Sequence, residues 1–174
     1  MSADLSAISL GELLAYDEYE VTRWREWFAK QPPEILDIKT GTAAVPEAGD
    51  DLRWLLFHIF AVQLRYAEWI LNMPQKSKED FMAMPRATLD DLFSIGDQAR
   101  KLLAEFAAKT TLEELAEVVS YNSPKFKMSA TKRKCFLQAI LHGDRHWAQI
   151  AVLVREAGYK TDWVHDFIMS PTME

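Results

Sequence analysis

The chain has 174 residues, of which 49% are hydrophobic, so it can bury one full-sized core, as a globular protein does. Its 26 acidic residues outnumber the 20 basic ones, and the formal charge of −6 argues against a general nucleic-acid binder. Cys135 is the only cysteine, which excludes an internal disulfide and favours a reducing, cytoplasmic location. We expect no signal peptide and no membrane span, because residues 54–64, the most hydrophobic stretch, are too few.

The first predicted helix begins after Ser9, which forms a capping-box pattern with Glu12 three residues later. Apolar residues then recur at helical spacing until the helix ends before the Pro-Pro pair at 32–33. Asp17 falls within this apolar stripe, which predicts an inward-leaning carboxylate. Residues 31–47 are expected to form a loop. Three aliphatic residues are expected to anchor this loop: Ile35, Leu36 and Ile38.

The second helix is predicted to run from Pro46 to Asn72, with Pro46 in its first turn. It has a broad apolar face, and His58 lies on the shoulder of that face. After this helix, residues 77–81 are expected to form one short helical turn.

The third long helix begins after Thr88, which is followed by Asp91 in another capping pattern. A shorter helical piece is predicted from Thr111 to about Val119. The fourth long helix is predicted to begin after Ser129 and to end at residue 157, because Gly158 can adopt the left-handed conformation that stops a helix.

Little strand-like alternation is present, so the pattern predicts an all-α four-helix bundle. We expect one domain over residues 1–174, with a core at about 8–158 and a tail at 159–174. Three large apolar residues suggest that the tail packs on the bundle at least in part: Trp163, Phe167 and Ile168.

The most informative stretch is the apolar stripe of the last helix, which contains two histidines. Its members follow at steps of four and three: Cys135, Ala139, His142, His146, Gln149 and Leu153. His142 and His146 lie one turn apart on one face, close enough for two ring nitrogens to share an ion. Burying each imidazole without a partner costs about 1–3 kcal/mol, which a divalent cation would offset. The alternative, an ordinary pair of satisfied or half-exposed histidines, is the commoner case for an arbitrary helix.

These residues resemble the DinB-like family of metal-dependent bacterial proteins, which includes YfiT-like thiol transferases. The resemblance rests on residues 13–17, 55–59 and 153–158 and on the pattern His142-x-x-x-His146-x-x-Gln149-Ile150. It implies a bundle of up-down-down-up type with one metal ion, typically nickel or zinc. The implied metal ligands are three histidines: His58, His142 and His146.

Two positions depart from the family pattern. Trp147 and Ala148 stand where the family commonly has a second histidine and an Arg-Gly pair, and Gln63 stands where it often has an acidic residue. Because the three ligands match, these departures bear on the surroundings of the metal and on the substrate.

Three neutral imidazoles leave an open coordination position, which is typical of a catalytic metal site. An ion there can lower the pKa of bound water to about 7 or hold a thiolate. Nitrogen donors suit zinc, nickel and copper about equally, so the donors do not identify the metal.

Several residues near the predicted ligands have both a functional and an ordinary interpretation. Asp17 can orient a ligand imidazole, or it can meet an arginine or water at the end of the bundle. Gln149 can hydrogen-bond a metal-bound water or satisfy a backbone group. His165 can act as a fourth ligand or proton carrier, although a mobile surface histidine is the commoner case in a tail. Trp54 and Trp147 can wall a substrate pocket or serve only as core.

One basic cluster lies around the start of the last helix. It can receive an anion with help from the helix dipole, although a solvated face is the commoner meaning of such a cluster. Its members are Lys125, Lys127, Lys132, Arg133 and Lys134.

The resemblance implies a metal-dependent transferase or hydrolase that activates a small thiol or water for attack on an electrophilic substrate. The expected partners are a small-molecule substrate and a low-molecular-weight thiol, with no nucleic acid and no membrane. The alternatives are a non-catalytic, stress-related metal-binding protein and a plain helical scaffold. Exposed apolar residues on the first and third long helices are compatible with a homodimer.

Overall fold

The computed structural model describes residues 8–41, 49–122 and 127–173 of the chain. Four long helices dominate it, as predicted: α1 (Leu10–Phe28), α2 (Leu52–Ile70), α4 (Leu89–Lys109) and α6 (Lys132–Glu156). The shorter elements are η1 (Pro33–Asp37), α3 (Lys78–Met82), α5 (Leu112–Ala116), β1 (Val118–Asn122), β2 (Lys127–Thr131) and η2 (Phe167–Met169). The predicted all-α class is therefore confirmed.

Two of the predicted helix starts are confirmed by their caps. The Ser9 hydroxyl accepts a hydrogen bond from the backbone N–H of Glu12, whose carboxylate accepts one from the Ser9 N–H. Thr88 and Asp91 exchange the same pair of bonds at the start of α4. Each cap satisfies N–H groups that have no partner within the helix.

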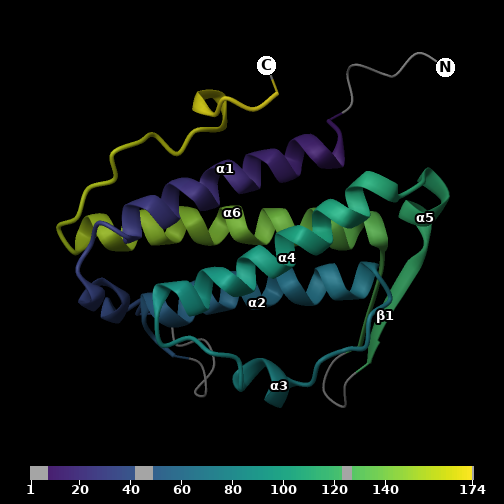
Figure 1. The fold of residues 1–174 in the computed structure, drawn as a ribbon, viewed down its shortest axis with the longest axis horizontal. Coiled ribbons are helices and arrows are strands. Elements are labelled where there is room, and N and C mark those ends of the chain that lie inside the picture. Colours follow the sequence, from purple (N-terminus) through teal and green to yellow (C-terminus); the bar gives the residue numbers. More distant parts are fainter. Residues whose placement is uncertain (1–7, 42–48, 123–126, 174) are drawn as a thin grey trace.

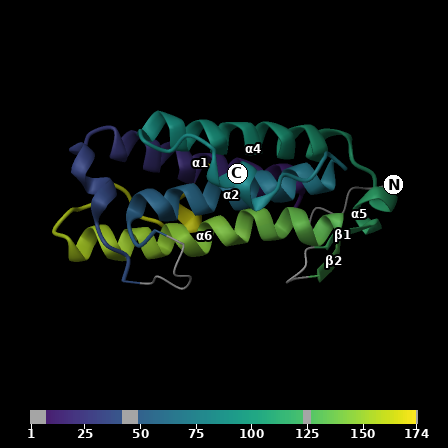
Figure 2. The ribbon, with the colours of Figure 1, turned by 90° about the horizontal axis from the view of Figure 1, so that it is seen from below.

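The four long helices lie side by side along the long axis of the molecule (Figures 1 and 2). α2 packs against α4 and α6, and α1 packs against the same two helices. α1 and α6 run in one direction and α2 and α4 in the other, with α3 between the parallel pair in the sequence (Figure 1). This is the up-down-down-up order that the family resemblance implies. None of the helices in the described ranges has the length and apolar character needed to cross a membrane.

The core consists of two apolar clusters. Aromatic residues from all four long helices fill the larger cluster: Trp24, Phe28, Phe60, Phe93 and Trp147. The smaller cluster joins α2, α4 and the first half of α6 and includes Cys135, whose thiol pKa is raised by burial. Cys135 therefore packs as a small apolar side chain rather than as a reactive thiolate.

The prediction for the start of the second helix is wrong, because α2 begins at Leu52 and not at Pro46. Asp51 is the N-cap, and its carboxylate accepts a hydrogen bond from the backbone N–H of Trp54. The N–H of Leu52 donates to the carbonyl of Ile38, so the chain just before α2 is tied to the end of the preceding loop. Pro46 itself lies outside the described residues.

The structure contains an antiparallel hairpin of β1 and β2 that the sequence does not predict. Val118, placed in the short helical piece, pairs with Thr131 across the hairpin, and α5 ends at Ala116. Ser129, predicted to cap the last helix, lies in β2. The cap of α6 is Thr131, whose hydroxyl accepts from the N–H of Lys134 at 3.2 Å.

The basic cluster does not form a uniformly solvated face. The side chain of Lys132 is only 2% exposed, and its ammonium pairs with Glu117 at 2.9 Å and Glu114 at 3.2 Å. Lys132 thus links the start of α6 to α5, and its charge is already compensated. Lys125 lies outside the described residues.

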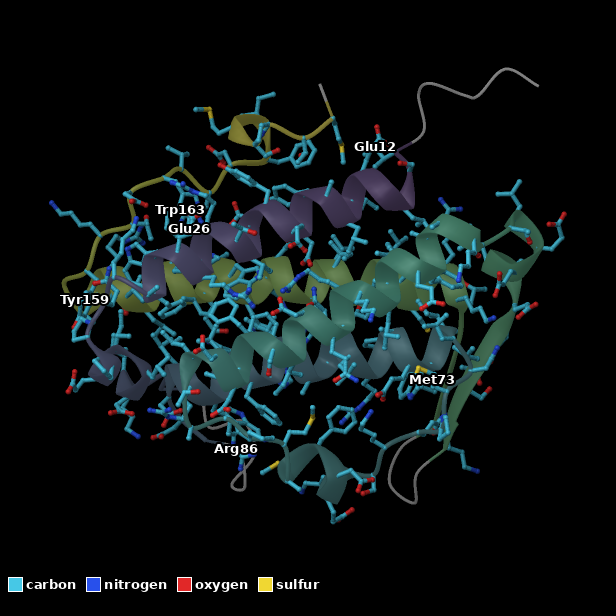
Figure 3. The ribbon with its side chains drawn as sticks, in the orientation of Figure 1. Glu12, Glu26, Met73, Arg86, Tyr159 and Trp163 are labelled. Atoms are coloured by element: carbon cyan, nitrogen blue, oxygen red, sulfur yellow. The ribbon has the colours of Figure 1, made fainter. Side chains whose placement is uncertain are left out.

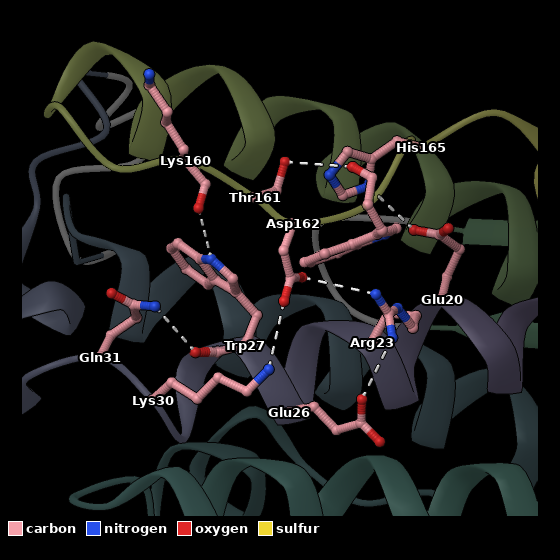
Figure 4. Close-up of polar contacts among 11 residues, drawn as sticks. Glu20, Arg23, Glu26, Trp27, Lys30, Gln31, Lys160, Thr161, Asp162 and His165 are labelled. Carbon is pink, nitrogen blue, oxygen red and sulfur yellow. Dashed lines mark hydrogen bonds and ion pairs between the residues drawn. The ribbon is translucent and has the colours of Figure 1, made fainter.

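The C-terminal tail packs along α1, as expected in part. Figure 3 shows Trp163 beside α1, and the Nε1–H of Trp27 donates a hydrogen bond of 2.9 Å to the carbonyl of Lys160 (Figure 4). Gly158 has a φ of 90°, which redirects the chain after α6 as predicted. Ile168 is 85% exposed and contributes little to this packing.

Candidate metal centre

Three histidines from two helices meet where α2 packs against α6. His58 comes from α2, His142 and His146 come from α6, and one donor nitrogen of each lies within 4.8 Å of the others. The ring centroids are 4.5 Å apart for the α6 pair and 4.8 and 5.1 Å from His58 to that pair. The structure therefore brings together the three residues that were predicted as metal ligands.

The helical register explains this meeting. His142 and His146 leave α6 from the same face, one turn apart. α2 runs opposite to α6 (Figure 1) and packs against it. This packing brings His58, in the first half of α2, next to the pair on α6. In the part of the chain that the structure describes, no cysteine or carboxylate joins this group.

Gln149 orients one of the imidazoles. Its side-chain oxygen lies 3.0 Å from Nδ1 of His146. An amide oxygen only accepts hydrogen bonds, so Nδ1 carries the proton and Nε2 keeps its lone pair. The side-chain oxygen of Gln149 thus contacts an imidazole of the cluster, in a contact of the kind that fixes the tautomer of metal-binding histidines.

All three imidazoles are neutral at pH 7. Burial, followed by the neighbouring imidazoles and Arg145, lowers the pKa of His142 to about 3. Burial is also the main cause that lowers the pKa of His58 to about 4, and it lowers the pKa of His146 against the opposing effect of the Gln149 hydrogen bond. Neutral imidazoles can bind a metal without first releasing a proton.

The imidazoles fit a divalent cation. Nδ1 of His142 and Nε2 of His146 are buried and have no hydrogen-bond partner among the described residues. Each such nitrogen costs about 1–3 kcal/mol, and one shared cation would satisfy both. Nitrogens around a tetrahedral ion with bonds of about 2.1 Å lie about 3.4 Å apart, so small side-chain rotations complete the site.

Asp17 lies inside the bundle, but its hydrogen-bond partner is not an imidazole. The Nε2 group of Gln63 donates to both carboxylate oxygens, at 2.9 and 3.0 Å. Asp17 is fully buried, and burial raises the pKa of its carboxyl group to about 7 even though the charge of Arg100 opposes the shift. Asp17 and Gln63 thus form a buried pair between α1 and α2.

Trp147 and His165 lie on the α1 side of the molecule. The ring of Trp147 stacks on Trp24 at 5.7 Å, so it belongs to the core. His165 stacks on the same Trp24 at 4.9 Å and contacts Glu20 at 3.3 Å (Figure 4). His165 is therefore held in the packing between the tail and α1, as neither a fourth member of the imidazole cluster nor a mobile surface residue. Trp54 is half-buried on α2.

The sequence interpretation missed Arg145, which lies three residues after His142 and directly before His146. Its positive charge contributes to lowering the pKa of all three imidazoles. The signal was present in the register, because residues 142, 145, 146 and 149 share one side of the helix.

No curated protein sequence matches the chain. The model of the DinB family matches it over residues 1–171. That match spans nearly the whole chain, including all four long helices and the three clustered histidines, and the chain belongs to the DinB family.

Proposed function

We propose that the protein is a metal-dependent enzyme that activates a small thiol, or water, for attack on an electrophilic substrate, as a thiol S-transferase does. The observation that supports this function most is the three-histidine cluster, which offers three neutral donors and no fourth ligand from the described residues. Three-donor sites of this kind leave a coordination position for a reactant.

A bound divalent ion would supply positive charge that lowers the pKa of a thiol or water. The protein's own residues prepare this chemistry. Burial keeps the imidazoles neutral, and Gln149 holds His146 with Nε2 free. We propose nickel or zinc as the ion, because imidazole donors suit both.

A second candidate is a metal-binding protein without turnover. It is favoured by the placement of Asp17, the buried carboxylate with a raised pKa, whose hydrogen bonds go to Gln63. A carboxylate engaged in this way is not available as a general base beside the imidazoles.

We also propose that the protein is cytoplasmic and homodimeric and binds small molecules rather than nucleic acid. The single cysteine and the charge of −6 support the location and the absence of nucleic acid. Light scattering coupled to size-exclusion chromatography measures the mass that decides the oligomeric state.

The first experiment is elemental analysis of the untagged protein beside its His142→Ala variant. We expect about one nickel or zinc per chain in the wild type and a large loss in the variant, because two imidazoles hold a divalent ion much less tightly than three. A matched control is His165→Ala, which removes an imidazole outside the cluster.

Activity then separates the two candidates. Metal-dependent transfer of bacillithiol, mycothiol or glutathione to an electrophile, or hydrolysis of an ester, supports the enzyme. A metal-loaded protein that is inactive with all these thiols and with a broad ester panel supports the non-catalytic candidate. A wild type that neither contains metal nor takes it up contradicts both.

A further inference from the structure

A cavity opens between α1, α5 and α6, at the end of the bundle where α1 begins (Figures 1 and 2). Its volume of about 550 Å³ falls within the roughly 300–1,000 Å³ that is typical of small-molecule sites. None of the three clustered histidines lines it. The cavity is therefore a second candidate site, independent of the metal-dependent function proposed above.

Aliphatic side chains from three helices line most of this cavity. Four of them are half-buried leucines: Leu10, Leu13, Leu115 and Leu137. Leu10 and Leu115 also pack against the smaller core cluster, so the apolar lining continues into the core. Two further lining residues extend into solvent, since Ile8 is 61% exposed and Leu112 is 83% exposed. An apolar ligand in the cavity would remove part of this surface from water, which stabilises a complex by about 25 cal/mol per Å².

The polar side chains that line the cavity are all hydrogen-bond donors, and none of the described lining residues is acidic. They are Ser9, Thr131 and Arg133. The hydroxyls of Ser9 and Thr131 accept backbone N–H groups of their own helices, so each still has a proton to donate. The guanidinium of Arg133 is exposed and forms no ion pair within the described ranges.

The acidic residues close to these donors in the structure have other partners. The carboxylate of Glu12 accepts the backbone N–H of Ser9, and Glu114 and Glu117 both pair with the buried Lys132. Ser9 and Thr131 are also the N-caps of α1 and α6, and the partial positive charge of a helix N-terminus favours anions. The cavity thus favours negative charge in a chain whose formal charge is −6.

Apolar walls and an unpaired guanidinium match a ligand that has an aliphatic chain and an anionic head. Guanidinium binds carboxylate through paired, charge-assisted hydrogen bonds, and an aliphatic chain is driven from water into an apolar cavity. We propose that this cavity binds a small aliphatic carboxylate, with the carboxylate on Arg133 and the chain along the four leucines.

Isothermal titration calorimetry of the full chain with octanoate tests this site. Two further ligands separate the chain from the head: 1-octanol has the same chain with a neutral head, and acetate has the head without the chain. Arg133→Gln removes the guanidinium. Its matched control is Lys134→Gln, which removes a positive charge from the next residue of α6, an exposed residue that does not line the cavity.

Two substitutions change the apolar part of the cavity. Ala116→Trp places a large ring in the cavity from the exposed last residue of α5, and Leu112→Ser removes an exposed aliphatic side chain from it. Both positions are exposed, so the fold should be kept, and circular dichroism of each variant checks this. We expect Ala116→Trp to weaken octanoate and 1-octanol by more than about tenfold and Leu112→Ser to weaken both by a few fold.

The wild type should bind about one octanoate per chain and no measurable acetate. We expect Arg133→Gln to weaken octanoate about tenfold, because a charge-assisted contact is lost, and to change the affinity for 1-octanol less than about twofold. Lys134→Gln should change either affinity less than about twofold. Arg133→Lys should retain part of the preference for octanoate.

Several outcomes overturn the proposal. One is a wild type that does not bind octanoate; if light scattering then shows a dimer that Ala116→Trp dissociates, a second copy of the chain covers the cavity. Another is equal weakening of octanoate by Arg133→Gln and Lys134→Gln, or no weakening by Arg133→Gln. Unchanged binding of both ligands to Ala116→Trp and Leu112→Ser places the ligand elsewhere and also overturns it.

A last control separates this cavity from the imidazole cluster. A carboxylate can also coordinate a metal ion, so each titration is repeated with added EDTA. Equal affinity for octanoate with and without EDTA supports the cavity. Loss of octanoate binding in EDTA places the carboxylate on a metal ion and overturns the assignment to Arg133.

Discussion

At the scale of single residues, the buried pair of Asp17 and Gln63 concerns one of the two positions where the chain departs from the family pattern. Gln63 stands where the family often has an acidic residue. In this chain it donates its amide to Asp17 on α1. A second carboxylate at that place would meet a fully buried Asp17 and repel it. The amide therefore suits a bundle that keeps one buried carboxyl group.

Replacing Asp17 with Asn tests the cost of that burial. The pKa of Asp17 is about 7 in the folded protein against a usual value of 3.8. The folded state therefore binds the proton more tightly than the unfolded state, and the wild type loses stability as the pH rises from about 4 to about 7. We expect Asp17→Asn to remove this loss, raising the free energy of unfolding at pH 8 relative to pH 4 by up to about 4 kcal/mol.

Urea denaturation at pH 4, 6 and 8 measures the effect. Glu105→Gln makes the same chemical change at an exposed position of α4 and should leave the pH dependence as it is. If the free energy of unfolding changes with pH equally in the wild type and in Asp17→Asn, the buried carboxyl group is not the source of this pH dependence.

At the scale of elements, local signals predicted the long helices and failed at their junctions. A capping box involves residues three apart, and an apolar stripe repeats within one helix, so both are visible in the sequence. The hairpin is different, because it depends on pairing between Val118 and Thr131 and on the burial of Lys132 against α5. Neither contact leaves a periodic pattern.

The start of α6 gives a direct comparison of the predicted and observed caps. Thr131→Ala removes the hydroxyl that accepts the N–H of Lys134, and we expect it to lower the free energy of unfolding by about 1 kcal/mol. Ser129→Ala removes only an exposed contact with the hydroxyl of Ser120, so we expect a change below about 0.5 kcal/mol. Chemical denaturation of both variants measures the difference. The reverse order of effects would restore Ser129 as the cap.

In the imidazole cluster, too, the sequence predicted what lies within one helix but not what depends on the packing of two helices. His142 and His146 were recognisable from their spacing, because a shared helical face is a local property. His58 became a candidate ligand only through the family resemblance, since its position across from α6 depends on how α2 and α6 pack. The sequence left two roles open for Trp147, a wall of a substrate pocket or part of the core, and one residue along a helix turns the side chain by about 100°. That rotation carries Trp147 from His146 into the core.

At the scale of the whole molecule, the C-terminal tail and the imidazole cluster lie against different helices. The tail lies along α1, where His165 contacts Trp24, Trp163 and Glu20. The cluster lies at the contact of α6 with α2. Packing of the tail and the proposed binding of a metal therefore use different sets of residues.

His165→Ala should accordingly destabilise the protein without removing its metal. The variant loses two ring contacts and leaves the buried Glu20 without its imidazole partner, so we expect the free energy of unfolding to fall by about 1–2 kcal/mol. Metal content should remain at the wild-type value. Denaturation and elemental analysis of one preparation measure both quantities, and a parallel loss of metal would instead make His165 part of the metal site.

The three clustered histidines lie on α2 and on the last long helix, with α3, α4, α5 and the hairpin between them in the sequence. During synthesis on the ribosome, a chain that ends before α6 contains one histidine of the cluster and lacks the pair on α6. An ion held by all three would also close the long chain segment between the two helices, which constrains the unfolded state more than a short loop would. If the cluster binds the proposed ion, we expect metal retention to report that the chain extends through α6 and has folded, and a truncated product should not compete for the ion.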